Sequence, residues 1–144
     1  MSNNPTFSLV KPSIKTKFHI DFDWWKNHDN NWHVFLFSYL CPDHQSMFKD
    51  ESLDAKIDWV DPETAEVFQV DGIQSILMNH CAKVDNFLTD NTALVDGVFR
   101  VFLANGNNPL DASELSDRIG KPAEIILRTI SSGAQIYRGI RPCR

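Results

Sequence analysis

Residues 108–132 read NPLDASELSDRIGKPAEIILRTISS and carry the start and stop signals of two short helices. Asp111 is a good helix N-cap, and Glu114 stands three residues later, where the reciprocal bond of a capping box needs it. Gly120 is the residue type that ends a helix in a left-handed conformation, and Pro122 suits the first position of the next helix. The stretch therefore predicts a helix, a glycine turn and a second helix.

The flanking residues extend this pattern in both directions. Behind a cap at Asn91-Thr92, residues 94–103 place apolar side chains at helical spacing, and residues 134–140 alternate apolar and polar side chains as a strand does. Helix, short helix, glycine turn, helix and strand is the element order of a winged helix-turn-helix. We therefore expect residues 91–144 to form a domain of that type.

The motif at 108–132 resembles the helix-turn-helix core of many bacterial winged-helix domains, over residues 92–141. At the positions where those domains bury side chains, this chain has Leu115, Ile119, Ile126 and Ile130. The resemblance implies that the third helix of the domain enters the major groove of duplex DNA and that the basic C-terminal strand contacts phosphate. The DNA contacts implied in this way are Lys121, Arg128, Arg138, Arg141 and Arg144. More loosely, the whole chain (FHIDFDWW, LCPDHQ, DWVDPETAEV, FRVFLANGN, RGIRP) resembles a group of bacterial proteins of unassigned function, which implies no mechanism.

Charge is distributed unevenly along the chain, whose net charge is −5. Residues 1–85 carry seven Lys against thirteen Asp and Glu, whereas residues 121–144 carry five cations against one acid. A localised basic end can steer a polyanion, and it can also dock onto the acidic half of another copy. The third helix holds no Asn or Gln with which to read adenine. Our first hypothesis is a winged-helix DNA-binding protein, a transcription regulator or accessory factor. The alternative is a non-enzymatic protein–protein interaction adaptor, and a homodimer stays open.

Ahead of this domain we expect a flexible arm at residues 1–13 and a small α/β body at residues 14–90, so that the chain as a whole is α+β. Hydrophobic period and turn residues define the elements of the body. They are a strand at 14–22, a helix running from an N-cap at Asp23 to Leu40, a further helical turn at 43–48 after Pro42, a hairpin at 56–71 and a helix at 73–83. Residues 34–40 also fit a strand.

A candidate metal site lies in this body. Cys41 and His44 form a Cys-x-x-His pair, with a proline between them that forces a turn, and His80 and Cys81 form a second pair. Thiolate and imidazole together suit zinc, which prefers four tetrahedral nitrogen and sulfur ligands. Because adjacent residues of a helix point about 100° apart, His80 and Cys81 reach one ion less easily. The alternative is that both cysteines are small buried hydrophobic side chains. A zinc-dependent regulator is accordingly a minor hypothesis.

Composition narrows the class of protein. A chain of 144 residues with 42% apolar and 23% charged residues is ordinary for a globular protein of one domain or two small ones. No apolar run approaches the roughly 18 residues of a membrane span, and the polar N-terminus has no signal segment, so we expect a cytoplasmic protein with no membrane partner. Three cysteines in such a protein are expected to be reduced. The sequence has no glycine-rich phosphate loop, nucleophile elbow or HExxH motif, so we expect no enzyme and no cofactor other than the candidate zinc.

Overall fold

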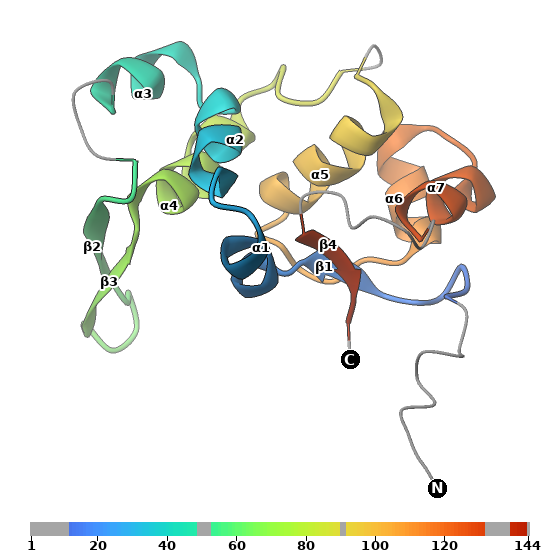
Figure 1. Cartoon of the computed structure of the whole chain (residues 1–144), viewed down its shortest axis with the longest axis horizontal. Helices are drawn as coiled ribbons and strands as arrows, with labels where there is room; N and C mark the ends of the chain where they lie inside the picture. The colour runs from blue at the N-terminus through green and yellow to red at the C-terminus, as the bar shows by residue number, and fades with distance from the viewer. Residues whose placement is uncertain (1–11, 49–52, 90–91, 132–138, 144) are drawn as a thin grey trace, which may run out of the picture.

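The computed structural model describes residues 12–48, 53–89, 92–131 and 139–143, and within them the protein is a mixed α+β fold (Figure 1). This confirms that the chain as a whole is α+β. In chain order the elements are β1 (Phe18–Ile20), α1 (Phe22–His28), α2 (Trp32–Ser38), α3 (Pro42–Met47), β2 (Lys56–Val60), β3 (Val67–Asp71), α4 (Gly72–Asn79), the 3₁₀ helix η2 (Cys81–Lys83), α5 (Leu94–Ala104), α6 (Ala112–Ile119), α7 (Ala123–Ile130) and β4 (Ile140–Pro142). Within the described ranges, β1 pairs with β4 and β2 pairs with β3, both antiparallel.

The short strand β1 lies between two segments from the other end of the chain. On one edge, Phe18 exchanges backbone hydrogen bonds with Leu110, with N–O distances of 2.8 and 3.0 Å. On the opposite edge β1 pairs with β4, and the backbone N–H of Asp21 donates to the carbonyl of Gly139 at 2.7 Å. Figure 1 shows β1 and β4 side by side beneath α5. Strand β1 therefore pairs with β4 on one edge and makes an isolated bridge to Leu110 on the other, so both partners come from residues beyond 109.

One hydrophobic core joins residues on both sides of position 90. The ring of Trp25, in α1, meets the ring of Phe99, in α5, edge-on at a centroid distance of 5.6 Å. Tyr39 contacts the same Phe99 ring at 5.2 Å, and its hydroxyl donates to the carboxylate of Asp96. Because Trp25 and Phe99 are almost fully buried, these contacts belong to the interior. The predicted body at 14–90 and the predicted domain at 91–144 therefore share their core.

The strand predicted at 14–22 is shorter in the structure, where it covers Phe18–Ile20. Residues 13–16 form a turn instead: the N–H of Thr16 donates to the carbonyl of Ser13 at 3.0 Å, and the Thr16 hydroxyl accepts from the N–H of Ser13 at 2.8 Å. Hydroxyl side chains that bond nearby backbone in this way compete with strand pairing. The alternating pattern alone could not reveal that competition.

The single helix predicted from Asp23 to Leu40 is also wrong, because α1 and α2 are separate helices. The break comes at Asp29, whose backbone is extended (φ −147°, ψ 108°) and whose carboxylate accepts the N–H of Asn31 at 2.8 Å. The N-cap of α1 is Asp21, not Asp23. Residues 34–38 are helical, so the alternative strand at 34–40 is not formed.

Most of the remaining predicted elements are present in the structure, some of them with shifted limits. The hairpin at 56–71 is confirmed as β2 and β3, and α3 begins at Pro42 as predicted. The helix predicted at 73–83 ends at Asn79 and is followed by η2. Helix α5 begins at Leu94 with Ala93 as its N-cap, directly after the predicted cap at Asn91-Thr92. Most of the strand predicted at 134–140 lies outside the described residues, and β4 starts at its last position.

The close packing of β4 against α1 gives a stability prediction. Gly139 has φ +78°, and a Cβ there would lie 3.0 Å from Cβ of Trp25 and 3.1 Å from the carbonyl oxygen of Asp21. Gly120 has a similar φ of +80° but nothing within 4 Å of the added atom. We expect Gly120→Ala to cost about 1–2 kcal/mol for the left-handed backbone, and Gly139→Ala to cost about 2–4 kcal/mol because the crowding adds to it. Urea unfolding followed by tryptophan fluorescence measures both, and equal losses would contradict the packing described.

Candidate functional site: a helix-turn-helix face and a cysteine–histidine cluster

Helix α6 begins with the capping box that the sequence predicts. The carboxylate of Asp111 accepts the N–H of Glu114 at 2.9 Å, and the carboxylate of Glu114 accepts the N–H of Asp111 at 2.9 Å. Lys17, from the turn before β1, donates to the same Glu114 oxygen at 2.6 Å. The N-terminal segment is therefore bonded to the start of α6 through Lys17, and to Leu110, just before α6, through Phe18.

The turn between α6 and α7 is fixed by its backbone. Gly120 is the left-handed C-cap of α6, as predicted, and the hydroxyl of Ser116 donates to the carbonyl of Lys121 at 2.6 Å. Pro122 is the N-cap of α7, so the predicted helix start is confirmed within one residue. Helices α6 and α7 are therefore joined by a left-handed glycine turn that short-range bonds hold.

Helix α7 is anchored on its inner face and open on its outer face. Of the four residues expected to be buried, Leu115 and Ile126 are fully buried, whereas Ile119 and Ile130 are half-buried against the core. On the outer face Glu124 and Arg128 are exposed, and Ile125 is 44% exposed. The spacing of Glu124 and Arg128 allows an ion pair, but within the described helix they form none. The outer face therefore offers a cation, an acid and an apolar side chain to a partner.

The five predicted DNA contacts have different surroundings. Lys121 and Arg128 are exposed on the turn and on α7. Arg141 lies on β4, where its guanidinium pairs with the Asp21 carboxylate at 3.4 Å and sits 5.4 Å from the centroid of the Trp24 ring. Two more, Arg138 and Arg144, lie outside the described residues. Sequence reasoning overlooked Arg118, an exposed cation on α6 whose charged side chain could have identified it as a surface residue.

Three of the four predicted metal ligands lie together at the other end of the molecule. Sγ of Cys41 is 3.0 Å from Nδ1 of His44, Sγ of Cys81 is 3.3 Å from the same nitrogen, and the two sulfur atoms are 3.3 Å apart. Cys81 is buried, whereas Cys41 and His44 are half-buried. The exposed His80 is adjacent, with its ring centroid 5.5 Å from that of His44.

Local structure explains how these side chains converge. Cys41 is the N-cap of α3 and His44 is in its first turn, so the two residues stand three apart on one side of the helix. Helix α4 ends at Asn79, and His80 leaves it with φ −126° and ψ −64°, so Cys81 starts a new direction in η2. His80 and Cys81 lie beyond the end of α4, so the angle of about 100° between adjacent residues of a helix does not apply to them.

Burial changes the acidity of the Cys81 thiol. Loss of hydration raises its pKa to about 11, and the hydrogen bond to Cys41 also favours the protonated form. In the metal-free protein at neutral pH, Cys81 is therefore a protonated thiol that donates to the sulfur of Cys41. Burial also raises the pKa of the thiol of Cys143, the third cysteine. Cys143 follows β4 and lies outside the cluster.

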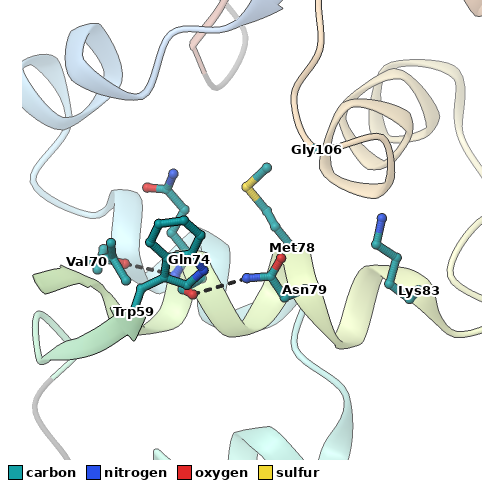
Figure 2. Close-up of a pocket in the computed structure, with 9 residues that line it drawn as sticks. Trp59, Val70, Gln74, Met78, Asn79, Lys83 and Gly106 are labelled. Atoms are coloured by element: carbon teal, nitrogen blue, oxygen red, sulfur yellow. Dashed lines mark hydrogen bonds between the residues drawn. The ribbon is translucent and has the colours of Figure 1, made fainter. Parts of the chain in front are cut away.

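A separate groove of about 530 Å³ runs along α4. Figure 2 shows Trp59 toward one end of the row of lining side chains and Lys83 at the other, with Met78 and Asn79 between them. The amide of Asn79 donates to the hydroxyl of Ser75 at 3.3 Å, and Lys83 donates to the carbonyl of Ala104 at 2.7 Å. Because these polar groups are bonded within the protein, the groove points to no particular ligand.

A smaller hollow of about 340 Å³ adjoins the start of α4. In it Nε2 of His33 lies 2.5 Å from a carboxylate oxygen of Asp71, and the other oxygen of Asp71 caps α4 by accepting the N–H of Gln74 at 2.9 Å. The pair therefore has a structural role in joining α2 to the start of α4.

Comparisons of the chain with protein-family models, with curated proteins and with solved structures gave no match. Within the described part of the chain, none of the helices has the length and apolar character needed to cross a bilayer.

The capping box gives a pH prediction. The hydrogen bond from Lys17, followed by the one from the Asp111 backbone, lowers the pKa of Glu114 from its ordinary value of 4.5. A carboxylate with a lowered pKa in the folded state stabilises the fold above its unfolded pKa and loses that contribution as pH falls through the folded pKa. We therefore expect Glu114→Gln to be less stable than the wild type at neutral pH, and this difference to shrink below pH 4.5. Urea unfolding across a pH series measures it, and a difference that does not change with pH would refute the ionic role of Glu114.

Proposed function

We propose that this chain is a winged-helix DNA-binding protein, a transcription regulator or accessory factor, that docks α7 in the major groove of duplex DNA. The observation that carries the proposal is the open outer face of α7, held by the capping box and the left-handed Gly120 against a buried inner face. A recognition helix has to project in this way to reach base edges. Lys121 and Arg128 flank the projecting face and meet phosphate.

The small sheet supports the winged-helix assignment. A winged helix has a strand between its first two helices and further strands after its third. Here Leu110 stands between α5 and α6, and β4 follows α7. The central place between them is taken by β1, from the N-terminal part of the chain. The proposed domain is thus a variant in which the sheet is completed by a strand from outside residues 91–144.

Local charge sets how strong the binding will be. Residues 111–130 carry three cations, Arg118, Lys121 and Arg128, against four acids. Two of those acids, Asp111 and Glu114, are occupied in the capping box. With Arg141 held by Asp21, the cations that the α6–α7 segment offers to phosphate are Arg118, Lys121 and Arg128. Three released counterions give a log–log salt slope of about −2 to −3 and modest affinity.

The test is fluorescence anisotropy of a random-sequence duplex titrated with full-length protein across a salt series. We expect binding at low salt with a slope of about −2 to −3, and a Lys121→Glu/Arg128→Glu variant should flatten it by about two. The matched control is Lys56→Glu, which reverses an exposed cation on the hairpin at the opposite end of the molecule (Figure 1). No binding at about 50 mM salt, or equal effects of both variants, would refute DNA docking through α7.

A second candidate, the protein–protein adaptor, is favoured by one observation. Ile125 is 44% exposed in the middle of the outer face of α7, where a protein partner gains from apolar contact. The homodimer is the simplest such partner. If α7 docks onto another copy, Ile125→Ser should shift the sedimentation of the protein from dimer to monomer and leave the salt slope for DNA unchanged. A wild-type monomer at all concentrations would exclude self-docking.

A further inference from the structure

We propose that the protein binds one zinc ion through Cys41, His44 and Cys81, with His80 as the fourth ligand. The proposed function of α7 neither requires nor assigns this site. Cys41, His44 and Cys81 form a compact cluster between the start of α3 and η2, and the ring of His80 lies beside that of His44. Figure 1 shows α3 at the end of the molecule away from α7.

The convergence of three donor atoms is the main observation. Cys41 and Cys81 stand 40 residues apart in sequence and on different elements, yet their sulfur atoms are 3.3 Å apart. The ligand atoms of Cys41, His44 and Cys81 all lie within 4.8 Å of one another. Among the described residues, this trio is the group of His, Cys, Asp and Glu side chains whose atoms meet closely enough to hold one ion. Burial of Cys81 as a small apolar side chain would not require an imidazole nitrogen to face both sulfur atoms.

The distances fit a tetrahedral ion after a small expansion. With Zn–S bonds of about 2.3 Å and Zn–N bonds of about 2.0–2.1 Å, tetrahedral ligand atoms stand about 3.6–3.8 Å apart. The observed separations are 3.0, 3.3 and 3.3 Å. Each pair has to open by about half an ångström, which small rotations of three side chains can supply.

The donor set selects the metal. Two sulfur atoms and an imidazole nitrogen suit zinc, whereas calcium and magnesium require oxygen ligands. No carboxylate belongs to the cluster among the described residues. Zinc also replaces the protons of both thiols, so the hydrogen bond between the two sulfur atoms gives way to two metal–thiolate bonds.

His80 completes the coordination. Its backbone has already left α4, and its exposed ring lies 5.5 Å, centroid to centroid, from the ring of His44. The buried sulfur of Cys81 closes the inner side of the cluster, and His80 stands on the solvent side. In the proposed site the exposed His80 side chain rotates to place one ring nitrogen at the fourth position, which its neighbouring ring and its exposure allow. The site is therefore closed and structural, as sites with four protein ligands are.

The zinc ion would serve to hold α3. None of the six residues of α3 is buried, and the buried side chain that follows it is Phe48. A helix this short with an unburied surface gains little from packing. Coordination by Cys41 and His44 ties the start of α3 to the end of α4, and binding that favours the folded state raises its stability in proportion to metal occupancy.

The experiment uses untagged full-length protein. Elemental analysis should find about one zinc per chain, as one tetrahedral site requires. After chelation, Co²⁺ should give thiolate-to-cobalt charge transfer in the near ultraviolet and the intense visible bands of a tetrahedral ion. The chelated protein should also unfold at a lower temperature than the zinc-loaded one.

Variants assign the ligands. Cys41→Ser and Cys81→Ser should each remove part of the charge-transfer band, whereas the matched control Cys143→Ser, outside the cluster, should leave it intact. His80→Asn changes an exposed side chain, so this variant should fold, and it should weaken Co²⁺ binding by more than the roughly tenfold that loss of a supporting partner costs a metal site. An unchanged Co²⁺ affinity in His80→Asn would refute His80 as the fourth ligand.

Wild-type protein provides a readout if the cysteine variants fail to fold. Zinc should protect Cys41 and Cys81 from alkylation, as mapped by peptide mass spectrometry, and should leave the reactivity of Cys143 unchanged. The proposal is overturned if purified protein contains no zinc and Co²⁺ produces no charge-transfer band. A mass showing the loss of two hydrogen atoms, with a disulfide mapped to Cys41 and Cys81 in freshly purified protein, would overturn it as well.

Discussion

The structure depends on one strand position: β1 lies between Leu110 and β4. Phe18 exchanges backbone bonds with Leu110, and the side-chain amide of Asn107 continues the same edge by bonding both the N–H and the carbonyl of Ile20 at 2.8 Å. Phe18 and Ile20 point into the core that supports α5. The N-terminal body therefore cannot separate from the C-terminal helices without unpairing β1 from Leu110 and β4.

Short sequence motifs predicted correctly the elements that are fixed by hydrogen bonds between residues close together in the chain. The capping box of Asp111 and Glu114, the left-handed Gly120 and the β2–β3 hairpin each depend on residues a few positions apart, and all are present. Elements whose limits depend on competing contacts were predicted less well. Asp29 breaks a continuous helical period with a side-chain bond that hydrophobic spacing does not record. The position of β1 depends on residues about 90 positions away, which no local pattern encodes.

The same contrast between nearby and distant residues holds for the candidate sites. The Cys-x-x-His spacing identified Cys41 and His44, because both belong to one helix start. That Cys81 joins them depends on how the start of α3 lies beside η2 in the folded chain, and the sequence indicated only the residue type. For the basic C-terminal residues, the sequence shows how many cations there are but not which acids they pair with. Arg141 pairs with Asp21, 120 positions earlier in the chain, and lies over the ring of Trp24. Counting charges in the sequence therefore overestimates how many of the described cations are available to a polyanion, because Arg141 is already paired.

The measurement that tests this account most directly is the amide NMR spectrum of a fragment containing residues 91–144 alone, beside that of the whole protein. Without β1 the fragment leaves Leu110 and β4 unpaired and exposes the faces of α5 that cover Trp25. The account predicts narrow amide dispersion and rapid exchange, as in an unfolded chain. A well-dispersed spectrum, whose peaks overlay those of the same residues in the whole protein, would contradict it and make the helix-turn-helix an autonomous domain.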